Sequence, residues 1–374
     1  MKSLLSTFFL CFFLFFILGC GEKQERTMIN LPSPDSSVKI TENFRQEESS
    51  LPDIPENTTP QGMTASPLTN EWVSLETASL RPLAVMIPND ASALPHYNLS
   101  KADILYEVPV EGNMTRLMGI FGDWTTLERV GNIRSCRDYF VYWAFEWDAI
   151  YIHAGGPFYI HDVIGRHDTQ NIDALSAPEG VFYRTTDRSA PQNLYFDGSS
   201  LLKEAGRLSY PLEIREGYRD NLHFQFSREE NRLDQYSQAS FAQKIYLKNA
   251  YPVTGTWFEY NEGDGLYYRF QSISNGAHMD AATGKQLAFK NIILQFTYSE
   301  VRDSQGYLAF QCIDSSRDGW YFTNGKAIHI NWRKDSDYGS TRYYDDNGNE
   351  ILLNTGKTMI CILRDGSTFS FTNK

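Results

Sequence analysis

The chain has 374 residues, with 34 Lys or Arg against 46 Asp or Glu and a net charge of −12 at pH 7. This acidic balance lacks the basic footprint of nucleic-acid-binding proteins, so we expect no nucleic-acid partner. It also excludes electrostatic attraction as the force that would hold the protein on an anionic membrane. The length is typical of two domains.

The first twenty residues have the pattern of an export signal. Lys2 precedes an unbroken apolar run of eleven residues, Phe8 to Leu18. That run is shorter than the about 20 residues that a membrane-spanning helix needs, so we predict a signal peptide over residues 1–19. Ile17 to Cys20 resembles the lipobox of bacterial lipoproteins, which implies cleavage before Cys20 and a lipid on its sulfur. In the alternative interpretation, an ordinary secretory peptide, Cys20 is incidental.

The segment that follows is rich in Pro, Ser and Thr and shows no apolar periodicity. Such a composition cannot bury enough surface to offset the entropy lost on ordering. We therefore expect a disordered, lipidated tether over residues 20–80. The signal peptide predicts export. The lipid and the tether would then hold the protein on the outer face of the bacterial cell membrane, or on the periplasmic side of an envelope membrane.

Cysteine is scarce beyond the signal, because only Cys136, Cys312 and Cys361 follow Cys20. Three cysteines in a chain of this length do not make a disulfide framework, even in an oxidising compartment. Whether Cys312 and Cys361 pair or remain free thiols is left open by the sequence.

Residues 81–226 alternate short apolar runs with polar stretches. The runs predict strands over 82–87, 102–108, 115–121 and 149–154, and an aromatic helix over 139–146. Strands that read as continuous apolar runs, separated by helical pieces, are typical of a sheet covered on both faces. We therefore predict an α/β domain over 81–226.

Residues 227–249 are polar and predict a linker or short helix, and the pattern then changes. From residue 250 to 374 the apolar residues recur nearer every second position, as in strands at 256–260, 266–270, 291–298, 319–323, 326–332 and 357–363. Turn sequences such as Asn324-Gly325 separate them and are strong hairpin signals. The prediction is a mostly antiparallel β domain, so the chain is α+β overall.

Five blocks of the first half carry a resemblance to a known family. They are Arg81 to Ile87, Leu99 to Glu107, Glu111 to Arg116, Val130 to Phe140 and Asp148 to Gly156. These blocks, with His278-Met279-Asp280 in the second half, resemble the YerB-like bacterial lipoproteins over about residues 81–374. The resemblance implies a lipoprotein with an α/β domain and a β-rich domain, and it implies no reaction. The chain departs from the family pattern at Cys136 and Asp138.

A second comparison rests on the order of elements alone. A strand after Asp103, then Arg137-Asp138, then a strand ending at Gly155-Gly156 is similar to the arrangement in LytR-CpsA-Psr phosphotransferases, which act on polyprenyl-diphosphate-linked glycans. This fold-level analogy implies Asp103 as a base or metal ligand, with Mg²⁺ as the cofactor, and Arg137 as a diphosphate clamp.

Arginines stand out in this acidic chain. Guanidinium groups bind phosphate or carboxylate through paired hydrogen bonds. A cluster near strand ends would therefore form an anion site, and the candidates are Arg116, Arg134, Arg137, Arg184 and Arg188. In the alternative interpretation they form structural ion pairs with nearby carboxylates such as Asp103 and Asp138.

Histidines give weaker signals. His153 opens a group with His161, Asp162, His167 and Asp168, whose side chains suit a divalent metal but whose spacing fits no compact motif. His278 and Asp280 suit a general base with its carboxylate, although a turn in which Asp280 bonds its own backbone is the favoured interpretation.

These features lead to two functional hypotheses. The first is an envelope lipoprotein that binds an anionic cell-wall glycan or a protein partner. The alternative is a metal-dependent envelope phosphotransferase or phosphohydrolase that uses the arginines and Asp103. No nucleophile and base can be paired from the sequence, so binding is preferred over catalysis.

Overall fold

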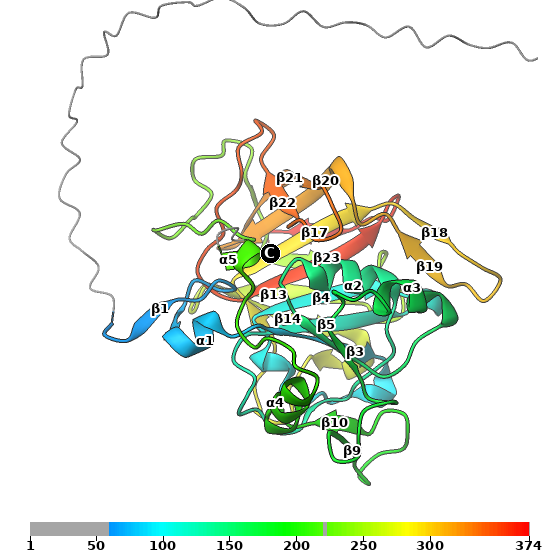
Figure 1. Ribbon diagram of the computed structural model, residues 1–374. Helices are drawn as coiled ribbons and strands as arrows, with labels where there is room; N and C mark the ends of the chain where they lie inside the picture. The colour runs from blue at the N-terminus through cyan, green and yellow to red at the C-terminus, as the bar shows by residue number, and fades with distance from the viewer. Residues whose placement is uncertain (1–59, 220–222, 374) are drawn as a thin grey trace, which may run out of the picture. The chain divides into compact units, whose positions relative to one another are not determined.

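The computed structural model describes residues 60–219 and 223–373 (Figure 1). The predicted signal peptide, Cys20 and the tether up to residue 59 lie outside the described residues. No helix in the described ranges is both long and apolar enough to span a bilayer.

The last part of the predicted tether is folded, which corrects the expectation that disorder extends to residue 80. It forms β1 (Met63–Ala65), β2 (Trp72–Ser74) and α1 (Leu75–Ser79). The Ser74 hydroxyl accepts a hydrogen bond of 3.0 Å from Thr77 N and so caps α1. Leu68 is buried in the main core. A few apolar and capping residues order this segment despite its polar composition.

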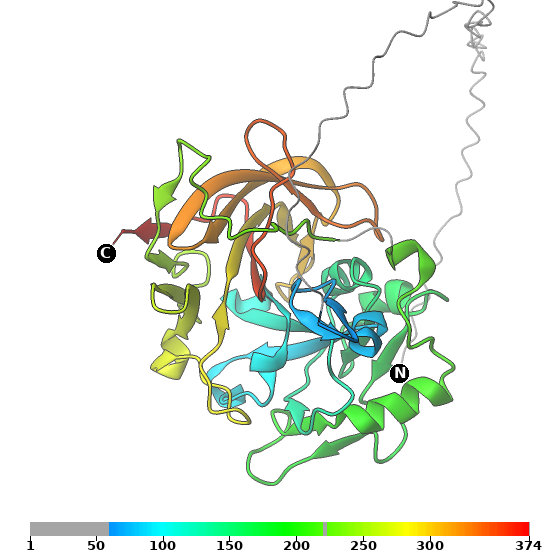
Figure 2. The ribbon, with the colours of Figure 1, turned by 90° about the vertical axis from the view of Figure 1, so that its left-hand side faces the viewer.

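A mixed eleven-stranded sheet forms the centre of the described part. Its order is β11-β21-β20-β17-β23-β4-β5-β3-β7-β8, with β22 paired to β21. The strands are β3 (Leu83–Asn89), β4 (Ile104–Pro109), β5 (Thr115–Phe121), β7 (Ile150–His153), β8 (Asn171–Asp173), β11 (Ser240–Phe241), β17 (Asn291–Thr297), β20 (Asp314–Thr323), β21 (Lys326–Lys334), β22 (Arg342–Tyr344) and β23 (Thr358–Arg364). Figure 2 shows β20 and β21 in orange beside β17 in yellow.

Strands from both predicted domains belong to this one sheet. β23, near the end of the chain, pairs in parallel with β17 on one side and with β4 on the other, where Met359 lies opposite Leu105. The division at residues 227–249 stays a prediction, because the sheet continues across it. Within the described residues 223–239 no helix forms, so this segment is an irregular link.

The sheet separates two hydrophobic cores. Along β3, Ala84 and Met86 belong to one core, and Leu83, Val85 and Ile87 to the other. The period of two places alternate side chains on opposite faces. Helix α2 (Asp138–Phe145) covers the first face, as Figure 1 shows, and confirms the helix predicted over 139–146.

The second face is covered by a smaller sheet and by α4 (Gly198–Arg207). The small sheet has the order β15-β14-β13-β12-β24, with β16 paired to β14. Its strands are β12 (Lys244–Tyr246), β13 (Trp257–Asn261), β14 (Leu266–Gln271), β15 (Gly276–Ala277), β16 (Ala288–Phe289) and β24 (Ser370–Thr372). The chain is thus α+β with largely antiparallel sheets, as predicted.

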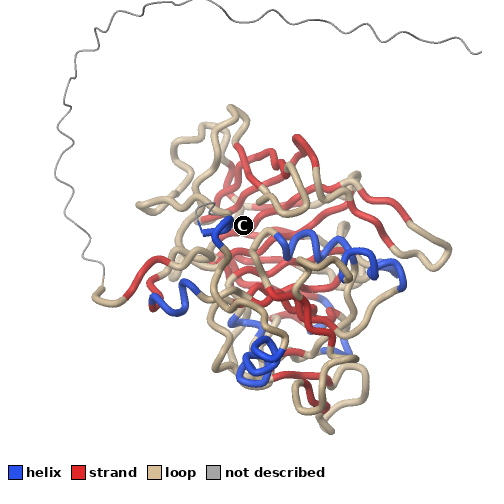
Figure 3. Tube along the Cα trace, viewed as in Figure 1, coloured by secondary structure: helices blue, strands red, loops and turns tan. Residues whose placement is uncertain are grey.

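The remaining elements are short and lie around these sheets (Figure 3). They are β6 (Val130–Gly131), β9 (Phe182–Arg184), β10 (Leu194–Phe196), β18 (Ser299–Val301), β19 (Leu308–Phe310), α3 (His161–Ile164) and α5 (Glu216–Arg219). The predicted Asn324-Gly325 hairpin joins β20 to β21, with φ of 50° and 69° at its two central residues. Cys136, Cys312 and Cys361 are buried free thiols.

Candidate functional site

Three of the predicted arginines meet at one edge of the central sheet. Arg116 lies near the start of β5, and Arg134 and Arg137 lie between β6 and α2. The Arg134 backbone is held between neighbouring strands, because its N–H donates to Met86 O and its carbonyl accepts from Ala154 N. This position is the carboxyl end of the parallel strands β3 and β7, the edge at which open α/β sheets bind ligands.

Arg137 is the arginine of this cluster whose charge is compensated. Its Nε donates to Glu111 Oε2 at 3.1 Å, a second guanidinium nitrogen bonds Glu111 Oε1, and Nη1 donates to Cys136 O at 2.6 Å. The side chain is buried. This paired contact with a carboxylate fixes the plane of the guanidinium group.

Arg116 and Arg134 lack such a partner. Arg116 donates to Ser135 O at 2.7 Å, and no carboxylate of the described residues lies within 4.0 Å of either guanidinium. Burial and the neighbouring Arg137 lower the pKa of Arg116 to about 10. Burial also lowers the pKa of Arg134, which Asp90 partly offsets, and its Nε is buried without a partner. Among the described residues these two partly buried cations therefore have no carboxylate in contact, and Glu111 and Asp90 attract them only at longer range, an arrangement that favours the binding of an anion.

Aromatic side chains border the cluster. The Arg137 guanidinium carbon lies 5.0 Å from the centre of the Tyr307 ring, which meets the Tyr159 ring edge-on at 5.6 Å. Arg302 lies 4.0 Å over Tyr159, and the neighbouring Phe158 is 79% exposed. We name the set of Arg116, Arg134 and Arg137, with Tyr159, Tyr307 and Phe158, the arginine edge.

The other predicted anion-site residues are placed differently. Arg184 is exposed and donates to Asn193 Oδ1 at 2.8 Å, although its charge reaches Arg134. Arg188 donates to Ala93 O and Pro95 O and so holds a loop. Asp138 forms an ion pair with Arg302. The structure therefore gathers three of the five arginines and leaves Arg184 and Arg188 at its margin.

Asp103 lies at the opposite end of the same strands. In the pairing of β4 with β5, Ile104 lies opposite Ile120 and Val108 lies opposite Arg116. Arg116 and Ile120 are four positions apart along β5, which amounts to about 13 Å. Asp103 Oδ2 accepts a hydrogen bond of 2.7 Å from Gly122 N, and burial raises the pKa of its carboxyl to about 6. The structure does not bring Asp103 and the arginines together.

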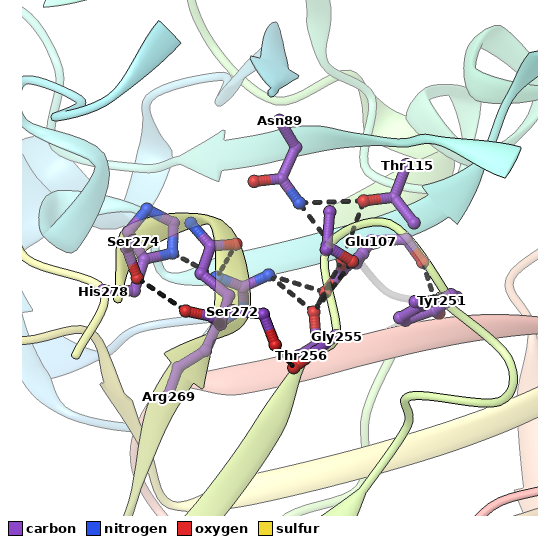
Figure 4. Close-up of polar contacts among 12 residues, drawn as sticks. Asn89, Glu107, Thr115, Tyr251, Gly255, Thr256, Arg269, Ser272, Ser274 and His278 are labelled. Atoms are coloured by element: carbon purple, nitrogen blue, oxygen red, sulfur yellow. Dashed lines mark hydrogen bonds and ion pairs between the residues drawn. The ribbon is translucent and has the colours of Figure 1, made fainter. Parts of the chain in front are cut away.

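His278 belongs to a fully buried polar network that joins the two sheets (Figure 4). The network is centred on Glu107 of β4 and Arg269 of β14, whose ion pair is 2.7 Å long. Three further side chains donate to the Glu107 carboxylate at 2.8–3.1 Å: Asn89, Thr115 and Thr256. The Tyr251 hydroxyl ties Glu107 O of β4 to Ile362 O of β23. Its side chains are at most 2% exposed, so the network is closed to a ligand and joins the two sheets.

The two histidines of the network are neutral, and their hydrogen bonds run in one direction. His96 Nε2 donates to Pro88 O at 2.8 Å, which leaves His96 Nδ1 to accept from His278 Nε2 at 2.9 Å. His278 Nδ1 then accepts from Arg269. Burial lowers the pKa of His96 to about 4 and that of His278 well below its usual value. Neither histidine has a free nitrogen with which to act as a base.

Asp280 closes the loop next to this network. Its Oδ1 accepts from Ala282 N at 2.8 Å and from Asn98 N at 3.0 Å, and its Oδ2 accepts from Ser100 N at 2.7 Å.

His153, the first residue of the candidate metal group, is buried as well, with Nδ1 bonded to Gly155 O and Nε2 to Asn171 Oδ1. Within residues 60–219 and 223–373, no group of three His, Cys, Asp or Glu side chains is arranged to hold a metal.

Sequence reasoning missed the partners of these groups. Glu107 and Arg269 are 162 residues apart, and Tyr159 and Tyr307 lie in different halves of the chain. It also missed a buried set in which Glu146 bonds His223 at 2.5 Å and Lys334 at 3.0 Å. A charged residue inside an apolar run, as Glu107 is in β4, is the signal that could have indicated a buried pair.

Comparisons with known proteins agree with this architecture. The chain matches the N-terminal domain of a protein family of unknown function, DUF3048, over residues 68–211, and its C-terminal domain over 245–360. It is 25% identical over 334 residues to YerB of Bacillus subtilis (strain 168), a protein provisionally named a lipoprotein, covering 89% of this chain and 88% of YerB. The crystal structure of Bacillus subtilis YerB superposes with a TM-score of 0.70 and 25% identity, covering 82% of this chain and 99% of that one. The chain therefore belongs to the DUF3048 family.

Proposed function

We propose that this protein is an exported lipoprotein, anchored through a lipid on Cys20, that binds an anionic cell-wall glycan at its arginine edge. Support for the anchor comes from the lipobox-like sequence Ile17 to Cys20 and from the similarity to YerB, itself provisionally named a lipoprotein. An acidic chain needs such an anchor because its charge does not attract it to an anionic membrane. The folded part then faces the cell wall.

The observation that carries the binding proposal is the pair of uncompensated guanidiniums. Arg116 and Arg134 are partly buried, stand next to Arg137 and meet no carboxylate of the described residues within 4.0 Å. A phosphate or carboxylate would receive paired hydrogen bonds there and would neutralise charge that the protein leaves unpaired.

The aromatic border favours a glycan as the carrier of that anion. Sugar rings present C–H faces that pack on aromatic rings, and Phe158, Tyr159 and Tyr307 lie beside the arginines. The phosphotransferase hypothesis needs Asp103 and a Mg²⁺ ion near the arginines, and Asp103 lies at the other end of the strands.

Binding is tested by isothermal titration of the chain from Gly21 onward with a phosphorylated oligosaccharide and with its dephosphorylated counterpart. We expect binding of the phosphorylated form alone, reduced at least about tenfold in Arg116→Gln and in Arg134→Gln, because each change removes a charged hydrogen bond. Arg333→Gln is the matched control, since Arg333 is exposed and lies on β21. Equal binding by Arg116→Gln and Arg333→Gln would refute the site, and binding of a protein instead of the glycan would redirect the proposal.

The anchor is tested by fractionating cells that produce the wild-type chain or Cys20→Ala. We expect the wild type in the membrane fraction and the variant in the soluble fraction, because the lipid is attached to the Cys20 sulfur. Cys136→Ala is the control for the loss of a thiol. Retention of Cys20→Ala in the membrane fraction would contradict lipidation at this position.

A further inference from the structure

A recess lies at the end of the central sheet that is remote from the arginine edge. The cavity itself has a volume of about 70 Å³, and it lies within about 650 Å³ of empty space that includes the open mouth, so it suits only a small ligand. Apolar side chains of the N-terminal segment and of the sheet's connections form its walls, among them Leu68, Leu80, Trp147 and Ile214. A concave, mostly apolar hollow with a few polar groups is the usual form of a small-molecule site.

The polar lining of this recess is acidic. Asp103, Asp123 and Glu146 line it, and no Lys or Arg of the described residues does. Glu146 is already compensated, because Lys334 lies 3.0 Å from it and Thr341 and His223 bond its oxygens. Asp103 is not compensated in this way. Its Oδ2 accepts from Gly122 N, and its Oδ1 accepts no hydrogen bond from the described residues.

A second unused acceptor lines the same recess. His223 Nε2 donates to Glu146 Oε2 at 2.5 Å, and the imidazole stacks on Trp147 with 3.7 Å between ring centres. This hydrogen bond fixes the tautomer, so His223 Nδ1 carries a lone pair, and it has no partner among the described residues. His223 is 95% buried, so the vacant acceptor belongs to the interior of the site.

We propose that this recess binds a small amine in its ammonium form, with the nitrogen on Asp103 Oδ1 and the hydrocarbon part against Trp147 and the apolar walls. A ligand that fills this site must donate hydrogen bonds, since Asp103 and His223 both offer acceptors. A positive charge suits it as well, since Asp103 and Asp123 line the recess and no Lys or Arg of the described residues does. This inference does not rest on the arginine edge.

The charges around Asp103 bear on how binding depends on pH. Lys357 favours the carboxylate, Glu71 and Asp123 disfavour it, and burial raises its pKa to about 6. At pH 7 the carboxylate is therefore charged and available to the ammonium. Below pH 6 it takes up a proton, and the site loses its negative charge.

The test is isothermal titration of the chain from Gly21 onward, which contains every described residue, with n-butylammonium and with n-butanol as the uncharged probe. We expect saturable binding of n-butylammonium at pH 7, weakened at least about tenfold in Asp103→Asn and at pH 5. Glu262→Gln, which removes an exposed carboxylate, is the charge-matched control and should bind as the wild type does. Binding that is absent, equal in Asp103→Asn, or equal for n-butanol would overturn the proposal.

A second variant keeps the test valid if Asp103→Asn unfolds. Val73 lines the recess from β2, which belongs to a separate two-stranded sheet, so Val73→Trp should fill the recess without disturbing the central sheet. We expect it to abolish n-butylammonium binding and to retain the cooperative urea unfolding of the wild type. Undiminished n-butylammonium binding in Val73→Trp would place the amine elsewhere and refute the recess as its site.

Discussion

Arginines occur both in the buried network around Glu107 and at the arginine edge, but the two regions differ in whether a carboxylate neutralises their charge. In the network, Arg269 meets a carboxylate at 2.7 Å, and threonine and asparagine side chains fill the remaining positions of that carboxylate. At the edge, Arg116 and Arg134 meet no carboxylate of the described residues. A charge that the fold compensates serves stability, whereas one that the fold leaves uncompensated costs stability and is available to a ligand.

The largest expected effect comes from breaking the compensated pair. Glu107→Gln removes the charge opposite Arg269 and leaves a fully buried guanidinium unpaired. We expect the free energy of unfolding to fall by about 3–5 kcal/mol, measured by urea denaturation. A change below about 1 kcal/mol would show that the pair does not hold the two sheets together.

Acid should weaken the same network through its neutral histidines. An unfolded histidine has a pKa of 6.5, whereas the pKa of folded His96 is lowered to about 4 and that of His278 is lower still. Below pH 6.5 the unfolded chain therefore binds more protons than the folded chain does. Stability is present in full above pH 6.5 and falls as the pH approaches 4, by about 3 kcal/mol from His96 alone.

Two other groups with shifted pKa values, Asp103 and His223, also change the stability in acid, so the measurement must separate their effects from that of His96. Asp103, with its pKa raised to about 6, acts in the opposite direction, because protonation stabilises its folded form. Burial lowers the pKa of His223, which therefore acts in the same direction as His96. Urea midpoints at pH 7, 5.5 and 4.5 are best compared between Asp103→Asn and Asp103→Asn/His96→Gln. An equal decline in both would exclude His96 as the cause.

The smallest effect, and the one of opposite sign, is expected at the arginine edge. Arg116→Met replaces an uncompensated, partly buried cation by an apolar side chain of similar length. Without ligand we expect the free energy of unfolding to stay equal or to rise by about 1 kcal/mol. A loss of about 3 kcal/mol or more would place Arg116 among the structural charges, like Arg269.

The local elements were predictable from the sequence because local patterns determine them. Thr115–Phe121 and the Asn324-Gly325 hairpin were predicted at their observed positions, since an apolar run and a turn dipeptide are short-range signals. The insertion of β23 between β17 and β4 was not predictable, because pairing between distant segments leaves no local pattern.

The candidate site was predictable in part for the same reason. Arg134 and Arg137 are neighbours in sequence and in space, whereas Asp103 and Arg116 are neighbours in sequence that the strand register places at opposite ends. Glu107 was visible as a charge inside an apolar strand, but its partner Arg269 was not, because that contact depends on how the two sheets pack.

One measurement tests the difference between the two regions most directly. It is the thermal unfolding midpoint of the wild type and of Arg116→Met, each with and without the phosphorylated oligosaccharide. A ligand that binds the folded chain raises the midpoint. We predict that the ligand raises the wild-type midpoint and leaves that of Arg116→Met unchanged, while the ligand-free variant is at least as stable as the wild type. An equal ligand-induced rise in both proteins, or a ligand-free variant of much lower stability, would contradict the assignment of Arg116 to an anion site.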